Sequence, residues 1–247
     1  MAPADIPQPR PAAPTFPQVI AMHGWASDAR QWQPLEAIAQ ARGWAWQSGE
    51  RGYGARRPHQ PRWREEGRRV VIAHSLGPHL LPAEVLASAD AVVLLASFAR
   101  FLPAGKAGRR LRTALQGMAA ALTDPSEARA MLRRFLIEAA APDPLEAMAP
   151  GPADDPLAPE ALERLRDDLR LLERTAGLPE AFPTGVPVLI VEAGADRIVA
   201  PEARALLRDA LPHAACLPLA GAGHALLRAP LLEPLLAWLQ DGRLSPP

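Results

Sequence analysis

The sequence predicts an α/β domain: a mostly parallel, doubly wound sheet interrupted by a helical insertion. Short apolar runs rich in β-branched residues alternate with helix-like segments along the 247-residue chain. This alternation is typical of parallel sheets covered by helices on both faces. It stops over residues 101–182, where helical patterns continue without a convincing strand. We therefore expect one core made of two chain segments, with the insertion between them.

Five short apolar runs bounded by turn residues are predicted to be buried strands. They cover residues 18–24, 68–75, 90–97, 186–194 and 214–221. Helix-like segments lie between or after them, at residues 31–41, 77–88, 201–210 and 230–240. A proline-rich segment, residues 1–17, precedes the first strand, so the expected core consists of residues 18–100 and 183–247.

Residues 101–182 are expected to form a helical lid over the sheet. Two stretches within them, SEARAMLRRFLIEAA and PEALERLRDDLRLLERT, have the spacing of helices with one apolar face. The Pro-, Asp- and Gly-rich stretch APDPLEAMAPGPADDPLAP separates the two and is predicted to be a loop or hinge.

The composition excludes several classes of protein. The 27 basic and 27 acidic residues balance, which gives no sequence-wide attraction to nucleic acid or to an anionic membrane surface. The single cysteine, Cys216, rules out an internal disulfide, and no apolar run approaches the ~20 residues of a membrane span. The N-terminus lacks the apolar core of a secretory signal. We expect a cytoplasmic protein that recognises its partners through local surfaces.

The second predicted strand runs into the stretch AHSLGPH, where small residues surround Ser75 at a turn into a helix. The pattern small-x-Ser-x-Gly at a strand-to-helix turn matches the nucleophile elbow of α/β-hydrolases, in which a strained turn exposes the serine hydroxyl. Alanine stands at the first small position, where glycine is commoner. An ordinary polar turn can carry the same five residues, so the assignment depends on the rest of the chain.

A serine nucleophile needs a base, and the base needs a carboxylate to orient it. Asp196 follows the strand at 186–194, and His224 follows the last predicted strand on a glycine-rich loop. Taken singly, Asp196 could be a turn residue and His224 a loop histidine. The chain order Ser75, Asp196, His224, with each residue just past a strand, favours a catalytic triad of nucleophile, acid and base.

The first predicted strand ends in MHGWASDARQW, and an early strand of such a fold can supply a backbone N–H donor for an oxyanion. The N–H groups of Trp25 and Leu76 are the candidate donors. The Trp25 side chain could equally serve in packing, and both roles are compatible because only its backbone would act. His23 is predicted to be structural.

Five stretches carry a resemblance to a known family. They are AMHGWASDARQW, AHSLG, ASFARFLPAGKAG with LRRFL behind it, LRDDLRLLE, and VEAGADRIVAPEARALLRDALPHAACLPLAGAGHAL. Together they resemble the α/β-hydrolase family of carboxylesterases that demethylate pimeloyl-acyl-carrier-protein methyl ester in biotin synthesis. The similarity extends from about residue 18 to residue 240. It implies an α/β-hydrolase fold, Ser75 as nucleophile, Asp196 as acid, His224 as base, and Trp25 and Leu76 as oxyanion donors.

Two stretches depart from the family pattern. Residues 47–57, QSGERGYGARR, stand where family members carry an Asp-Leu-Pro-Gly-His-Gly-like turn, and the elbow reads Ala-His-Ser-Leu-Gly-Pro rather than Gly-Trp-Ser-Leu-Gly-Gly. Both lie around the expected pocket, so they weaken the substrate assignment more than the reaction type. A broader esterase, a thioesterase or a carbon-carbon bond hydrolase stays open, and so does a binding module without catalysis.

Arginines gather on two short stretches of the insertion. They are Arg109, Arg110 and Arg112, and Arg129, Arg133 and Arg134. A solvated helix face explains them, and so does a docking surface for an acidic carrier protein or its phosphopantetheine arm. Arg129, Arg133 and Arg134 are the candidate contacts.

The remaining polar motifs indicate no bound group. His59, His79 and His213 lack spaced Cys, His or Asp companions, so no metal site is expected. No Gly-rich phosphate loop or dinucleotide fingerprint occurs, so no cofactor is expected. We expect a monomer that acts on a carrier-linked or small ester, with no nucleic-acid or membrane partner.

Overall fold

The computed structural model describes residues 17–64, 66–226 and 231–241, which form one parallel sheet in the order β2-β1-β3-β4-β5-β6. The strands are β1 (Gln18–Met22), β2 (Ala45–Ser48), β3 (Arg69–His74), β4 (Ala91–Leu95), β5 (Val188–Ala193) and β6 (Ala215–Leu219). The predicted parallel sheet and its five predicted strands are confirmed. The expected proline-rich segment, residues 1–17, lies outside the described residues except for Pro17.

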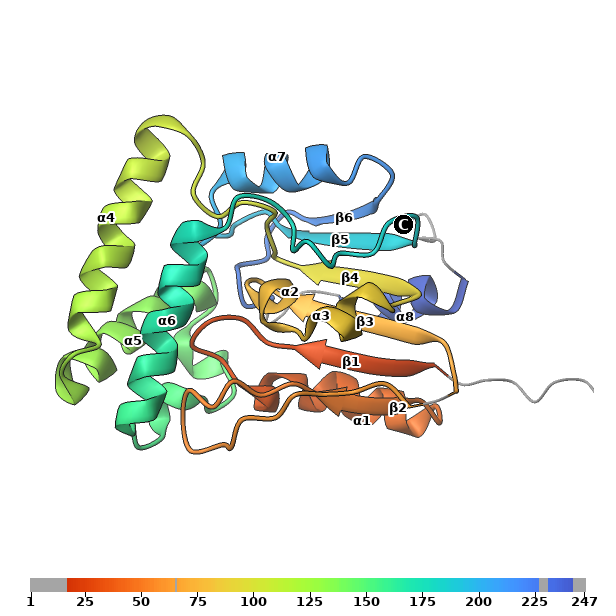
Figure 1. The fold of residues 1–247 in the computed structure, drawn as a ribbon, viewed down its shortest axis with the longest axis horizontal. Helices are drawn as coiled ribbons and strands as arrows, with labels where there is room; N and C mark the ends of the chain where they lie inside the picture. The colour runs from red at the N-terminus through yellow and green to blue at the C-terminus, as the bar shows by residue number, and fades with distance from the viewer. Residues whose placement is uncertain (1–16, 65, 227–230, 242–247) are drawn as a thin grey trace, which may run out of the picture.

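Helices cover both faces of this sheet (Figure 1). The α-helices are α1 (Gln33–Ala41), α2 (Gly77–Leu80), α3 (Ala83–Ala87), α4 (Gly105–Ala121), α5 (Pro125–Ala140), α6 (Pro159–Arg174), α7 (Pro201–Ala210) and α8 (Leu232–Asp241). The 3-10 helices are η1 (Ala29–Trp32), η2 (Leu145–Ala147) and η3 (Pro152–Asp154). None of the described helices is both long and apolar enough to cross a membrane.

The alternation of side chains along each strand builds two separate cores. In β1, Val19 packs with residues of α1 and α8, whereas its neighbour Ile20 packs with residues of α3 and α7. Successive side chains of a strand point to opposite faces of a sheet, so the central strands are buried on both sides and must be apolar throughout. This confirms the doubly wound architecture.

The insertion contributes α4, α5 and α6, which lie together beyond the end of the sheet toward which the strands point (Figure 1). Residues 101–182 contain no strand in the described structure, as expected. A third apolar cluster joins the insertion to the sheet edge, since Leu132 and Leu165 of the helices pack with Trp25, Leu76 and Phe98. The strand ends on this side are therefore covered.

Two details differ from the expected elements. The predicted helix 77–88 is broken into α2 and α3, because Leu81 precedes Pro82 and takes an extended conformation with φ −72° and ψ 147°. The ring of a proline disfavours helical geometry in the residue before it. Strand β2 was not among the five predicted strands, since AWQS is short and each of its side chains is only half-buried at the edge of the sheet.

Gly77 fixes how closely α2 approaches the end of β1. A Cβ atom at this position would lie 2.5 Å from the carbonyl oxygen of Met22, a contact that backbone atoms cannot relieve by rotating. Gly77 is therefore needed for the turn at Ser75 to lie against the end of β1.

Gly77→Ala should lower the free energy of unfolding by about 1–3 kcal/mol, the usual cost of forcing atoms into a filled site. Gly117 is the matched control, because it is exposed on α4 and its Cβ position has no atom within 4 Å. Gly117→Ala should raise the free energy of unfolding by about 0.5–1 kcal/mol, since alanine favours a helix interior. Urea denaturation measures both changes, and a shift of the same sign in the two variants would contradict this account of Gly77.

Candidate active site

Ser75 lies in a strained turn between β3 and α2. Its φ angle is +54°, a left-handed conformation that is uncommon for a residue with a Cβ atom and that clusters at functional sites. The turn is held by two hydrogen bonds: the Ser75 N–H donates to Leu95 O at 2.9 Å, and Ser97 Oγ donates to Ser75 O at 2.7 Å. The structure thus has the turn geometry that the elbow pattern predicts.

Asp196 and His224 are brought together from the loops after β5 and β6. His224 Nδ1 and Asp196 Oδ2 are 2.9 Å apart, and both side chains are almost fully buried. The other carboxylate oxygen accepts hydrogen bonds from the N–H groups of Ile198 and Val199 at 2.7 and 2.9 Å. Burial raises the pKa of Asp196, but His224 and these N–H groups outweigh it and lower the pKa overall. The aspartate is therefore ionised and fixed in orientation.

The His224 loop meets the Ser75 turn through His74. His74 Nε2 lies 2.9 Å from the His224 carbonyl oxygen, and the centres of the two imidazole rings are 4.9 Å apart. In the described residues no hydrogen bond joins Ser75 Oγ to the His224 ring. Catalytic hydrogen bonds of this kind often form only when substrate is bound. The three predicted triad residues therefore lie at the same end of the sheet, without a hydrogen bond between Ser75 and His224.

The two predicted oxyanion donors lie on either side of Ser75. A Cβ at Gly24 would lie 2.9 Å from the Ser75 Cβ, so the loop that carries Trp25 runs against the turn. Leu76 follows Ser75 directly and precedes the first residue of α2. Among the described residues, neither the Trp25 nor the Leu76 backbone N–H donates a hydrogen bond.

The Trp25 side chain connects this loop to the insertion. Its indole Nε1–H donates to Leu165 O on α6 at 2.8 Å, and its ring packs edge-on against Phe135 of α5 with centroids 4.9 Å apart. The packing role considered for Trp25 is therefore present, and it leaves the backbone N–H free.

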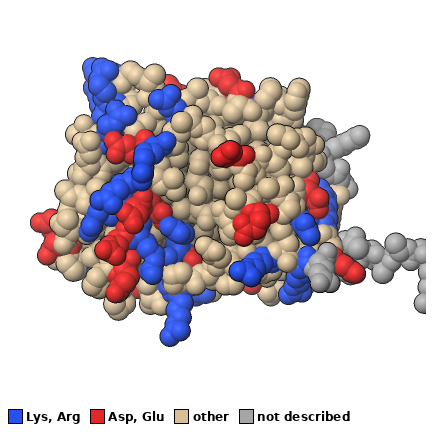
Figure 2. Space-filling view, viewed as in Figure 1, with Lys and Arg blue, Asp and Glu red and all other residues tan. Residues whose placement is uncertain are grey.

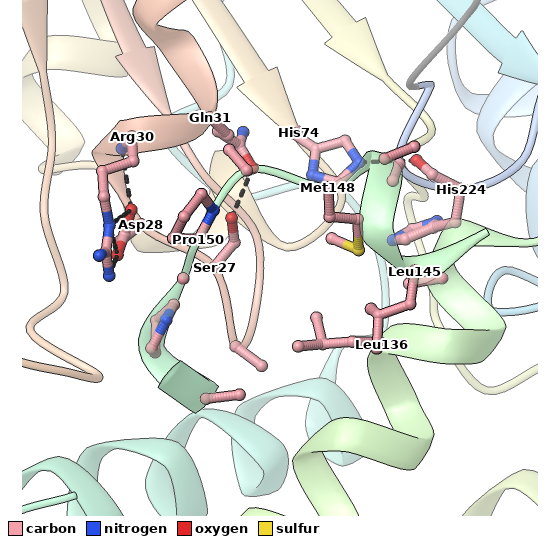
Figure 3. A pocket seen from close by; sticks show the side chains of 18 of the residues that line it. Ser27, Asp28, Arg30, Gln31, His74, Leu136, Leu145, Met148, Pro150 and His224 are labelled. Atoms are coloured by element: carbon pink, nitrogen blue, oxygen red, sulfur yellow. Dashed lines mark hydrogen bonds and ion pairs between the residues drawn. The ribbon is translucent and has the colours of Figure 1, made fainter. Parts of the chain in front are cut away.

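A cavity of about 1220 Å³ opens beside this site (Figure 3). His74 and His224 lie at one end, and the ion pair of Asp28 and Arg30 lies at the other. Between them the wall is mostly apolar, from α5, η2 and the residues that follow η2. The labelled residues of this wall are Leu136, Leu145, Met148 and Pro150.

A buried polar network that the sequence did not reveal joins residues 50–53 to α6. Tyr53 Oη lies 2.5 Å from Asp168 Oδ2, and the Arg51 guanidinium contacts both oxygens of Asp168 at 2.7 and 2.9 Å. The His23 ring packs edge-on against Tyr53, and its Nε2 accepts the Arg51 N–H at 3.2 Å. Asp168 is thus committed to this network and makes no contact with His224. No spacing rule links Asp168 to residue 51, so the sequence pattern could not predict their contact.

The three candidate arginines of α5 are in different situations. Arg129 donates to the carbonyl oxygens of Ala153 and Asp155 at 3.0 and 3.3 Å, which fastens α5 to the η3 segment. Arg133 and Arg134 are exposed and form no ion pair with a described residue. Over α4 and α6, in contrast, acidic and basic side chains are interspersed (Figure 2), as in the pair of Arg112 and Glu173 at 3.1 Å.

The described residues contain no group of three or more His, Cys, Asp or Glu side chains arranged to hold a metal ion. The two histidines at the site instead contact a carboxylate and a backbone carbonyl.

Neither a protein-family model nor a curated protein matches the sequence. Solved structures do match. An esterase from Exiguobacterium antarcticum superposes with a TM-score of 0.61 at 14% identity, over 92% of this chain and 93% of that one. An alpha/beta hydrolase fold protein from Burkholderia ambifaria superposes with a TM-score of 0.56 at 20% identity, over 92% and 91%. The chain has the α/β-hydrolase fold.

The same hydrolase fold occurs in AqDC, which is described as recognising the Pseudomonas quinolone signal and cleaving its ring. AqDC superposes with a TM-score of 0.62 at 17% identity, over 91% of this chain and 90% of that one. The fold therefore hosts more than one reaction, and the choice among them depends on the residues of the site.

His74→Gln should flatten the pH dependence of stability. Burial, with a smaller contribution from His224, lowers the pKa of His74 to about 3, whereas an unfolded histidine titrates near ~6.5. Between these values the unfolded chain binds more protons at residue 74, so wild-type stability is greatest above the upper value and falls as the pH falls. Glutamine removes this contribution.

Denaturant unfolding of both proteins at several pH values from about 5 to about 7.5 measures the two slopes. Burial also lowers the pKa of His79, to about 4. Because His79 is present in both proteins, it contributes equally to the two slopes. Equal slopes would show that His74 takes up a proton in the folded state.

Proposed function

We propose that the chain hydrolyses carboxylic esters through a serine acyl-enzyme, and that its substrate is pimeloyl-acyl-carrier-protein methyl ester. The observation that carries the reaction type is a strained serine turn that meets, at one sheet edge, a histidine bound to a buried carboxylate. The resemblance of five stretches of the sequence to the biotin-pathway esterases supports the substrate. The esterase from Exiguobacterium antarcticum, which has the same fold, is in keeping with ester hydrolysis.

In the proposed reaction, Ser75 Oγ attacks the ester carbonyl carbon while His224 Nε2 takes the hydroxyl proton, because Nδ1 is engaged by Asp196. The N–H groups of Trp25 and Leu76 donate to the oxyanion. His224 then returns the proton to the leaving alcohol, which is methanol for a methyl ester, and an acyl-serine remains. A water molecule attacks this acyl-serine with the same help, and the free acid and the serine are released.

The cavity favours an ester whose acyl chain is apolar near the reacting carbonyl, because Leu136, Leu145 and Met148 line it next to the histidines. Its volume of about 1220 Å³ exceeds the usual ~300–1,000 Å³ of a ligand pocket, so it does not restrict the enzyme to short chains. This size is the specific observation that favours a second candidate, a broader esterase or thioesterase of the same fold.

We propose that a carrier protein docks on the exposed side of α5. Arg133 and Arg134 are exposed and without a carboxylate partner among the described residues, and Arg133 is one of the residues that line the cavity. Rim charges of this kind raise association rates with an acidic partner. Arg129 differs from the other two candidates because its guanidinium donates hydrogen bonds within the insertion, to the carbonyl oxygens of Ala153 and Asp155.

Ser75→Ala should abolish ester hydrolysis, because the proposed acyl-enzyme forms on the Ser75 hydroxyl. The loss in kcat on p-nitrophenyl acetate should be at least about 10³-fold. Labelling by a fluorophosphonate probe should also disappear, whereas thermal unfolding should change little.

Two results would contradict this assignment. A wild-type protein that neither reacts with the probe nor hydrolyses any ester would indicate a binding module. An active Ser75→Ala variant would move the nucleophile elsewhere. Asp196→Asn tests the acid in the same assay, and full activity would exclude Asp196 from that role.

Arg133 and Arg134 replaced together by alanine should lower kcat/KM for the acyl-carrier-protein ester at low ionic strength and leave p-nitrophenyl acetate hydrolysis unchanged. Added salt should narrow the difference, since screening already weakens the attraction in the wild type. Arg129→Ala is the contrasting variant and should affect both substrates, because it loosens the contact between α5 and η3. Equal losses on both substrates in the double variant would refute docking at α5.

Growth without biotin tests the physiological substrate directly. The gene should restore growth to a host that lacks its own pimeloyl ester esterase, and the Ser75→Ala gene should not. Failure of the wild-type gene, combined with good activity on unrelated esters, would favour the broader esterase.

A further inference from the structure

We propose that His74 is a positioning residue, which fixes the backbone of His224 and thereby the aim of its imidazole at Ser75. The inference rests on the proposed function, because it assigns His74 a task only if His224 is the base. The observation behind it is that the two sides of one peptide unit are held by two different parts of the protein.

That peptide unit joins residues 224 and 225. Its carbonyl oxygen, on His224, accepts a hydrogen bond from His74 Nε2 at 2.9 Å, and its N–H, on Ala225, donates to Ala139 O at 2.9 Å. His74 ends β3 in the core, whereas Ala139 lies in the last turn of α5 in the insertion. The plane of the peptide is therefore set from both sides, and the direction of the His224 side chain follows from it.

The loop after β6 has hydrogen bonds of its own, from Ala195 N–H to Ala222 O at 2.9 Å and from Leu226 N–H to Gly223 O at 3.0 Å. Neither of them engages the peptide unit between residues 224 and 225. Glycine at positions 221 and 223 gives the backbone wide conformational freedom. Gly223 is also pressed against the insertion, since a Cβ there would lie 1.8 Å from Ala141 O. The bond from Asp196 fixes the imidazole about its own axis but does not hold the backbone that carries the ring.

The protonation state of His74 is that of a hydrogen-bond donor that holds the loop, and not that of a second general base. A carbonyl oxygen only accepts hydrogen bonds, so Nε2 must carry the proton of the neutral ring. Nδ1 is buried and has no hydrogen-bond partner among the described residues; it lies on the side toward Gly24, where an added Cβ would be 3.3 Å away. Burial lowers the pKa of the ring to about 3, so the ring is neutral at about pH 7. A neutral donor holds the carbonyl without placing a second positive charge beside the base.

The test compares two amides of different length. The side-chain nitrogen of glutamine falls near the position of histidine Nε2 and can donate to the His224 carbonyl, whereas that of asparagine falls near Nδ1 and cannot reach it. His74→Gln should keep kcat within about threefold of the wild type on p-nitrophenyl acetate. His74→Asn should lower kcat by about 10- to 100-fold, the scale expected when a catalytic group is misplaced by about 1 Å. KM should change less than kcat in both, because the apolar wall formed by Leu136, Leu145 and Met148 is not altered.

A second measurement does not depend on activity. Hydrogen exchange of the Ala225 amide, followed by NMR, should be at least about tenfold faster in His74→Asn than in the wild type and near wild-type in His74→Gln, since local opening exposes the amide. If asparagine prevents folding, His74→Leu, which is close to histidine in volume, replaces it in both measurements.

The outcomes separate the two hypotheses. Equal kcat in the wild type and both amide variants, or equal exchange in all three, would overturn the positioning role. Complete inactivity of both variants with unchanged exchange would make His74 part of the chemistry instead, and would also overturn it. A wild-type protein without any esterase activity would refute the proposed function only. The hydrogen-exchange comparison would still decide whether His74 holds the loop.

Discussion

The site depends on the close approach of three backbone segments around Ser75. The loop after β1, the turn after β3 and the first residues of α2 lie at distances that leave no room for a Cβ atom at Gly24 or Gly77. Because the two glycines have none, the loop that carries Trp25 and the turn that carries Ser75 and Leu76 can lie against each other at this end of the sheet. A larger residue at either position would move these segments apart, however well the rest of the sheet were packed.

The parallel sheet explains why residues so far apart in the chain share this point. The carboxyl ends of parallel strands meet at one edge, so the loops after β1, β3, β5 and β6 are neighbours there. The insertion between β4 and β5 then covers the edge. It does so through specific contacts as well as apolar packing, because Asp168 of α6 holds Tyr53 and Arg51, and Asp155 near η3 pairs with Arg30 at 2.6 Å.

Local patterns in the sequence predicted five strands of the sheet, the helices of the insertion and the positions of the loops that carry Ser75, Asp196 and His224. Each of these is encoded by a short run of residues with its own periodicity or turn signal. Strand β2 was missed because an edge strand needs little apolar content. The contacts of His74 and Asp168 were missed for another reason: each joins residues more than a hundred positions apart, and only the folded chain defines them.

The hydrogen bond from the Trp25 indole to α6 gives the insertion an influence on chemistry as well as on access. Trp25, whose backbone N–H is a proposed oxyanion donor, is held in place through its side chain by Leu165 O. Under the proposed reaction, displacement of α6 would remove that acceptor and with it the support of an oxyanion donor. The described lining of the cavity contains no residue of α6. A movement of this helix would therefore slow the chemical step even where the cavity kept its shape.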